Sequence, residues 1–134
     1  MKFTIVNNEQ VRTVIANKDE ATEIEAGDLV AITDGLIVKA THESDAVALA
    51  PYGAGDDTTE IEVTIGNDFI LSGTAESDFA VAQKGTAAGI IETTQTIDKD
   101  DAESKSVLTI DVSKDTGTVD AKTDVRVKIE KPIF

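Results

Sequence analysis

The sequence predicts an all-β protein, folded as a small β-barrel or β-sandwich. Val, Ile and Thr gather in short runs, and Gly, Asp, Asn and Ser lie between the runs. In the runs Glu60–Ile65 and Val125–Ile129, every second residue is Val or Ile. Strict alternation turns one face of a strand toward the core and the other toward water. Together these patterns favour a β-rich fold over a helical one.

The first section of the chain, residues 2–50, predicts strands divided by polar turns. Asp34-Gly35 lies between two apolar runs and predicts a hairpin, because a type I′ turn needs positive φ at both central positions. Pro51 ends the last run, and the N-terminal part is expected to form a β-arm or hairpin section. The strands expected here are Phe3–Val6, Val11–Ala16, Leu29–Thr33, Leu36–Thr41 and Ala46–Ala50.

The second section resumes after residues 51–58, a loop rich in Gly and Asp. We expect a single domain over residues 1–134, in which this loop is either an internal boundary or a long hairpin loop. Ser77–Lys84 fits a strand or a short helix capped by Ser77, and Asp98–Glu103 offers one helical turn. The strands expected here are Thr59–Ile65, Phe69–Leu71, Gly89–Glu92, Gln95–Ile97, Val107–Val112 and Asp124–Ile129.

The same alternation predicts which side chains enter the core. One face should carry Ile61, Val63 and Ile65, with Glu60, Glu62 and Thr64 opposite. Val125, Val127 and Ile129 should point inward, leaving Arg126, Lys128 and Glu130 to solvent or a partner. Only 4% of the residues are aromatic and none is Trp, so the core must be aliphatic, with Phe69 among its few larger side chains.

Charge and composition exclude several partners. The 134 residues include 26 acidic and 12 basic side chains, for a net charge of −14. Nucleic acids and anionic membranes attract basic surfaces, so we expect neither as a partner. The chain has no Cys, and no apolar run is near the length of a membrane span or of a signal peptide. We therefore expect synthesis in the cytoplasm and a soluble product.

Motifs for chemistry are not found, and the chain is not expected to be an enzyme. His42 is the only histidine, and it lies in a polar stretch without a nucleophile elbow. Asp98–Glu103 resembles a fragment of a calcium loop but lacks its central Gly and its distal Glu. Neither a metal site nor a cofactor is predicted.

Two stretches of the sequence carry a resemblance to a known family. The first stretch comprises Gly27–Val30, Asp34–Thr41 and Ala46–Ala50. The second comprises Phe69–Ala75, Lys84–Ile91 and Thr96–Asp98. The succession closes with Leu108–Asp111 and Val125–Ile129. This succession, from about Gly27 to Ile129, resembles the small decoration, or cement, proteins of tailed-bacteriophage heads.

The resemblance implies a β-rich, non-enzymatic protein on the outer capsid surface of the virion. Its partner would be the major capsid protein, whose neighbouring subunits it would clamp. It would be a homo-oligomer, with a trimer favoured and a dimer or monomer also found in the family.

Two groups of residues are candidates for partner binding. The run of Lys2, Phe3, Thr4, Ile5 and Val6 could add as an edge strand to a neighbouring sheet, or could pair within its own domain. The basic cluster of Lys122, Arg126, Lys128 and Lys131 is a local exception in an acidic chain. It could meet acidic capsid residues or be balanced by the protein's own carboxylates.

Rival functions use the same scaffold. A carbohydrate- or host-surface-binding module would read its ligand with loops, and Tyr52 is the aromatic residue best suited to it. An enzyme that uses pairs of Asp or Glu is a third class, for which no motif is present.

Overall fold

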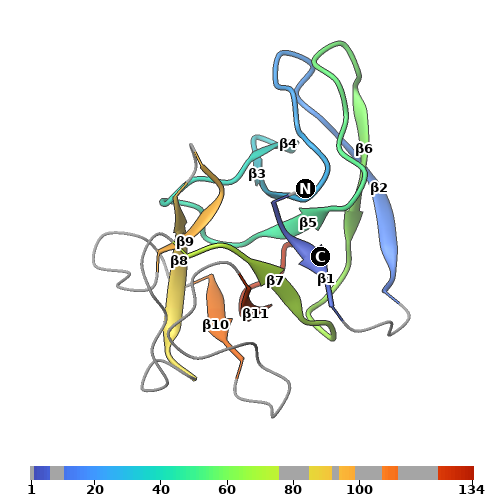
Figure 1. Cartoon of the computed structure of the whole chain (residues 1–134). Coiled ribbons are helices and arrows are strands. Elements are labelled where there is room, and N and C mark those ends of the chain that lie inside the picture. Colours follow the sequence, from blue (N-terminus) through green and yellow to red (C-terminus); the bar gives the residue numbers. More distant parts are fainter. Residues whose placement is uncertain (1, 7–10, 76–84, 92–93, 99–106, 112–123) are drawn as a thin grey trace.

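The computed structural model describes residues 2–6, 11–75, 85–91, 94–98, 107–111 and 124–134. This part of the chain contains no helix and forms eleven strands in three antiparallel sheets, which confirms the all-β prediction (Figure 1). The strands are β1 (Thr4–Ile5), β2 (Thr13–Asn17), β3 (Asp28–Thr33), β4 (Leu36–Lys39), β5 (Ala48–Ala50), β6 (Glu60–Thr64), β7 (Leu71–Gly73), β8 (Ala87–Ile91), β9 (Thr96–Asp98), β10 (Leu108–Ile110) and β11 (Val125–Ile129).

The largest sheet has six strands in the order β1-β7-β11-β10-β8-β9. It bends until the residues that follow β7 approach β9. There Ile97 N–H donates a hydrogen bond to Thr74 O at 2.7 Å, and Ala75 forms a single bridge with Ile97. One bridge does not make a ladder, so the barrel is not closed.

The second sheet has the order β4-β3-β5 and contains the predicted hairpin. Thr33 pairs with Leu36, so the β3–β4 turn has two central residues, Asp34 at φ 52° and Gly35 at φ 81°. Positive φ at both positions is the type I′ geometry that matches the twist of the flanking strands. The prediction from Asp34-Gly35 is confirmed.

The third sheet pairs β2 with β6. At the end of β2, Lys18 N–H donates to Thr59 O and continues the ladder with β6. Lys18 also forms a parallel bridge with Ile37 of β4, which joins the second and third sheets at one point. In Figure 1, β2 and β6 stand together at the right of the molecule.

The second sheet lies between two hydrophobic cores and serves both. Leu29 and Leu49, which are partners in register, enter the first core, whereas their neighbours Val30 and Ala48 enter the second. A strand buried on both faces has a continuous apolar sequence rather than an alternating one. The buried residues Leu29–Ala31 and Val47–Ala50 therefore carry no polar side chain.

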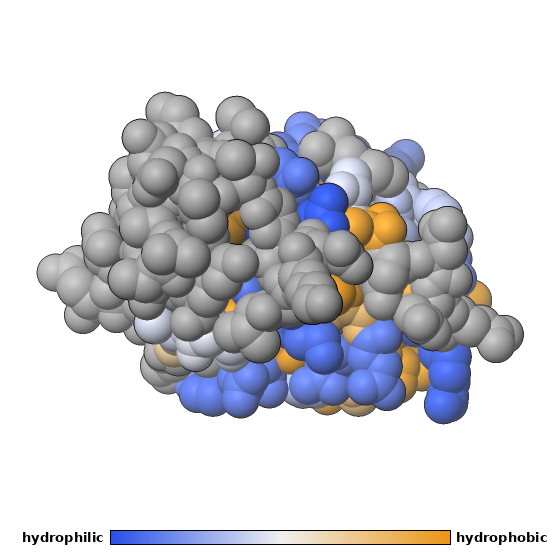
Figure 2. Space-filling model, turned by 60° about the horizontal axis from the view of Figure 1, so that its bottom comes forward, coloured by the Kyte–Doolittle hydropathy of each residue, from blue (hydrophilic) through white to orange (hydrophobic). Residues whose placement is uncertain are grey.

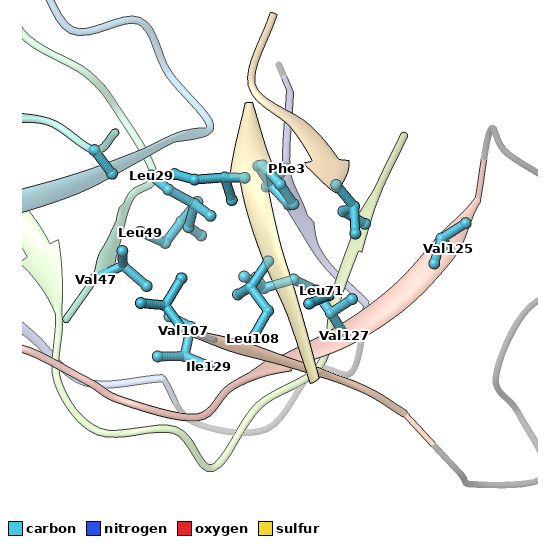
Figure 3. Close-up of a cluster of buried hydrophobic side chains, with 14 of the residues drawn as sticks. Phe3, Leu29, Val47, Leu49, Leu71, Val107, Leu108, Val125, Val127 and Ile129 are labelled. Carbon is cyan, nitrogen blue, oxygen red and sulfur yellow. The ribbon is translucent and has the colours of Figure 1, made fainter. Parts of the chain in front are cut away.

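The first core is formed by the six-stranded sheet and one face of the second sheet. Figure 3 shows Val47 and Leu49 on one side of it and Leu71 and Val127 on the other. Its largest members are Phe3, Leu29, Leu49, Phe69, Leu71, Ile90, Ile97, Leu108, Ile110 and Ile129. The second core contains Ile24, Val30, Ile37, Ala48, Ala50, Ile61 and Val63.

The inward and outward faces agree with the prediction. Val125, Val127 and Ile129 are buried, while Lys128 and Glu130 are exposed. In the other run, Ile61 and Val63 are buried in the second core. Thr64 lies on the opposite face but is also buried, and its Oγ1 accepts a hydrogen bond from Leu49 N–H at 2.9 Å, which satisfies the buried hydroxyl.

Strand positions differ from the predictions by a few residues at several ends. The largest shift concerns β7, expected at Phe69–Leu71 and found at Leu71–Gly73. Phe69 instead precedes the strand and fills the first core. The ambiguous segment 77–84 lies outside the described residues, as does the expected helical turn apart from Asp98, which ends β9.

Candidate partner-binding surface

The N-terminal run Lys2–Val6 contains an edge strand of the six-stranded sheet. Thr4 pairs with Ser72 and Ile5 with Leu71, so β1 pairs within its own domain through β7. The side chain of Phe3 is 1% exposed in the first core, and Phe3 N–H donates to Gly27 O at 2.9 Å. Because Phe3 lies in the core and its N–H is bonded to Gly27 O, neither its side chain nor its N–H is available to a partner.

Among the described residues, no strand pairs with the outer edge of β1, which presents the backbone of Ile5. Val6 N–H donates to Ile70 O at 2.9 Å, so Val6 belongs to the set of residues bonded to β7. Successive residues of an antiparallel strand direct their N–H and C=O groups to opposite edges. The N–H and C=O of Ile5 therefore point away from β7.

A shallow groove of about 300 Å³ runs beside this edge. It is lined by Phe3, Thr4, Ile5, Leu49, Pro51 and Tyr52. Tyr52 is 71% exposed and lies two residues after the end of β5, near the start of the loop 51–58. The groove thus combines an open strand edge with an exposed aromatic ring, a pairing that the sequence pattern did not predict.

An ion-pair cluster fixes the start of β1. Lys2 Nζ lies 3.2 Å from Glu25 Oε2 and 3.6 Å from Asp28 Oδ1, and Lys39 Nζ lies 3.4 Å from Asp28 Oδ2. Asp28 is fully buried, and its Oδ2 also accepts a hydrogen bond from Glu25 N–H at 3.0 Å. Two lysines and one backbone donor thus compensate a buried carboxylate.

The cluster shifts the pKa of its two outer members. Partial burial of the Lys2 ammonium acts against its charge, but the hydrogen bond to Glu25 and the charge of Asp28 raise the pKa of Lys2 above its ordinary value. The same hydrogen bond to Lys2 lowers the pKa of Glu25. Both shifts favour the charged pair that holds β1 in place.

The four basic residues proposed for partner binding differ in their position and in their ion pairs. Arg126 and Lys128 both project from the outward face of β11, and Lys131 is exposed just after the strand ends. Arg126 Nε lies 3.6 Å from Asp124 Oδ1, so one carboxylate of the protein already balances part of this charge. Lys122 lies outside the described residues.

The structure brings the two candidate groups together on one face of one sheet. Thr4 of β1 pairs with Ser72 of β7, and Ser72 pairs with Arg126 of β11. Residues directly opposite each other share a face, and adjacent strands lie about 4.8 Å apart, so Thr4 and Arg126 lie roughly 10 Å apart. Lys128 lies two residues further along the same face of β11.

Other parts of the described chain offer less for binding or chemistry. His42 is exposed, with Nε2 4.0 Å from Glu43 Oε1, beside an open hollow of about 440 Å³ between residues 41–46 and the end of β3. No group of three His, Asp or Glu side chains within the described ranges could hold a metal ion. Those ranges also contain no helix long and apolar enough to cross a membrane.

On the coloured part of the face shown in Figure 2, hydrophobic residues (orange) lie between hydrophilic ones (blue). The exposed large hydrophobic residues of the described chain are Ile15, Ile32, Leu36, Tyr52 and Phe134. They come from several elements and do not follow one another in sequence.

Comparison with protein-family models, with curated proteins and with solved structures finds no match for this chain.

Proposed function

We propose that this protein is a capsid decoration protein, which binds the outer surface of a tailed-phage head and stabilises contacts between major capsid subunits. The proposal starts from the resemblance of residues 27–129 to that family. The observation that supports it best is the shared face of Thr4 and Arg126, two positions at opposite ends of the chain. A protein that clamps neighbouring subunits needs more than one kind of contact within a small area.

The β1 edge supplies the first contact. An extended capsid segment would add to the edge of β1 as a further strand. Its backbone C=O would accept a hydrogen bond from the N–H of Ile5, and its backbone N–H would donate one to the C=O of Ile5. Its side chains would lie in the groove beside Tyr52. Because β1 is short, the aromatic ring must contribute much of the contact area.

The outward face of β11 supplies the second contact. Lys128 is exposed, and no salt bridge is formed by its side chain among the described residues. On a chain of net charge −14, a local cation directs the approach of acidic capsid residues and disfavours other orientations. This contact should weaken as salt increases.

Co-sedimentation with purified expanded heads tests the proposal. The parent should bind, and Lys128→Gln should weaken binding about tenfold, because it removes one steering charge at the contact. His42→Glu is the matched control, since it makes the net charge more negative by the same single unit on the loop 41–46. Arg126 is less suitable for charge reversal, because its ion pair with Asp124 would be lost as well.

The strand contact needs a backbone test, since deleting the N-terminus would remove the core side chain of Phe3. Ile5→Pro removes the outward N–H without removing a hydrogen bond to β7. Ile5→Ala is its control, because it loses the same side chain but keeps the N–H. The proline variant should bind heads more weakly than the alanine variant.

Two results would contradict these assignments. If Lys128→Gln and Ile5→Pro both bind as well as their controls, the contact surfaces are wrong. If the parent never binds heads, the decoration function itself is wrong.

The exposed ring of Tyr52 favours one alternative, a carbohydrate- or host-surface-binding module. An aromatic side chain beside an open groove is a common platform for sugar rings. Binding of soluble oligosaccharides that is lost in Tyr52→Ala, together with no binding to heads, would establish this alternative.

A further inference from the structure

Strands β4, β2 and β6 form one continuous surface on the outside of the second core. Strand β2 pairs with β6 over all five of its residues, and β4 joins its other edge at the parallel bridge between Lys18 and Ile37. Asp19 N–H donates to Ile37 O at 3.1 Å and holds this junction. Lys18 and Ile37 are both buried on the inner side. The residues before them, Asn17 and Leu36, therefore lie side by side on the outer face, where both line a hollow of about 320 Å³.

Two exposed apolar side chains form the centre of this outer face. Ile15 is 68% exposed in the middle of β2, while its neighbours Val14 and Ala16 pack on the second core. Leu36 is 39% exposed at the start of β4. Asn17 lies between them, because it follows Ile15 by two residues on the same face and adjoins Leu36. A single partner can therefore cover both apolar side chains.

Carboxylates surround the apolar centre. Glu62 is the direct cross-strand partner of Ile15, so one carboxylate lies immediately beside the most exposed apolar side chain. None of the surrounding carboxylates forms an ion pair within the described part of the chain. They come from the outer face of β6, from the β3–β4 turn and from the hollow beside Leu36, and they are Glu60, Glu62, Asp34 and Glu20.

The basic side chains nearest in sequence turn away from this face. Lys18 is buried, and its Nζ donates to Asp19 O at 2.7 Å and to Thr58 O at 3.3 Å. Arg12 lies before the other end of β2, and its odd spacing from Ile15 places it on the opposite face of the strand. The outer face is thus apolar at its centre and acidic around it.

The charges decide between the possible occupants. A second copy of the chain, placed face to face about a two-fold axis, would bring two acidic rims together and is disfavoured. A partner that carries an apolar side chain flanked by Lys or Arg matches both the centre and the rim.

We propose that the outer face of β2, β4 and β6 binds a basic protein segment. An aliphatic or aromatic side chain of the segment covers Ile15 and Leu36, and its Lys or Arg side chains lie against Glu60 and Glu62. Strands β1 and β11 belong to the six-stranded sheet and take no part in this contact. The inference therefore does not depend on head binding.

Titration of the isotope-labelled intact protein with short blocked peptides, followed by NMR, is the first test. The three probes are five-residue peptides of alternating Lys and Leu, alternating Lys and Ser, and alternating Glu and Leu. The Lys–Leu peptide should bind at least about tenfold more tightly than the Lys–Ser peptide, because only the former buries apolar surface on Ile15 and Leu36. The Glu–Leu peptide should not bind. The shifted amide signals should be concentrated at Ile15, Asn17, Leu36, Glu60 and Glu62.

A substitution at Ile15 tests the apolar centre. Ile15→Thr keeps the β-branched shape that suits a strand and should weaken binding of the Lys–Leu peptide about tenfold. Ile32→Thr is the matched control, because Ile32 is also an exposed strand residue but pairs with the core residue Ile37 and so faces the other side of the sheet. The control should bind as the parent does.

A substitution at Glu62 tests the acidic rim. Glu62→Gln removes the charge but keeps an acceptor for the Thr13 hydroxyl, and it should weaken binding about threefold. Glu43→Gln, on the loop 41–46, removes the same charge elsewhere and should have a smaller effect. The difference between the two variants should vanish at about 1 M salt, where the charges are screened.

Three results would overturn the proposal. The first is equal binding of the Lys–Leu and Lys–Ser peptides, since general attraction to an acidic protein would then explain all of the affinity. The second is equal binding by Ile15→Thr and Ile32→Thr. The third is self-association of the parent in sedimentation equilibrium that Ile15→Thr abolishes, since a second copy would then be the occupant of this face.

Discussion

The contact between Phe3 and Gly73 gives the sharpest test of how the N-terminal strand is held. A Cβ added at Gly73 would lie 2.5 Å from Cε1 and 2.7 Å from Cδ1 of the Phe3 ring. Both residues are buried, so the ring cannot move into solvent. Gly73 is thus required by the close approach of an aromatic ring and not by its backbone conformation.

The expected losses follow from this geometry. Gly73→Ala should cost about 1–3 kcal/mol of unfolding free energy through overpacking. Phe3→Ala should cost about 3–5 kcal/mol through lost burial and the resulting cavity. In the double variant the new methyl group occupies space that the ring has left, so the total loss should be smaller than the sum by about 1–3 kcal/mol.

Urea and thermal unfolding, followed by far-UV circular dichroism, would measure the unfolding free energies of the parent, the two single variants and the double variant. Fluorescence is a poor probe, because the chain has no Trp and its single Tyr is exposed. For a chain of this length, a loss of 1 kcal/mol lowers Tm by roughly 3–4 °C, so Phe3→Ala should lower Tm by about 10–20 °C. Additive losses, or a Phe3→Ala effect below about 1 kcal/mol, would refute the idea that the N-terminal strand belongs to the core.

Three further predictions concern other parts of the fold. Phe69→Ala should cost about 3–5 kcal/mol, because the side chain is buried in the first core, and urea unfolding will show it. Gln95→Ala should cost about 1–3 kcal/mol, since Gln95 Oε1 accepts a hydrogen bond from the buried N–H of Leu29 at 2.8 Å; a neutral result in the same assay would contradict this role. The lowered pKa of Glu25 stabilises the fold above about pH 4.3, and this contribution is lost as the pH falls through the folded-state pKa. The raised pKa of Lys2 stabilises the fold below about pH 10.4 and is lost as the pH rises through its folded-state pKa, so the pH–stability curve of Lys2→Met should lack both contributions.

Much of the secondary structure could be predicted from local patterns. Asp34-Gly35 specified its turn because few residues tolerate positive φ at both positions, and the alternation in Val125–Ile129 specified both faces of β11. Alternation identifies a face but not a partner strand. The pairing of β1 with β7 and of β2 with β6 therefore had to come from the structure.

The candidate surface was only partly visible in the sequence. Lys2–Val6 is indeed at a sheet edge, but a short apolar run does not show that Phe3 faces the core. The groove beside Tyr52 could not be predicted, because it joins a loop to a strand that lies far away in the chain. The same holds for Asp28, whose partners Lys2 and Lys39 come from two other elements.

Because the second sheet contributes to both cores, it couples them during unfolding and restricts which substitutions the protein can accept in evolution. Adjacent residues such as Leu29 and Val30 serve different cores, so a shift of the backbone that relieves crowding on one side creates a void on the other. Neither core can lose its order while the other keeps it, and unfolding should be cooperative across the two. For the same reason, substitutions in Leu29–Ala31 and Val47–Ala50 will be tolerated mainly when they are compensated on both faces of the sheet.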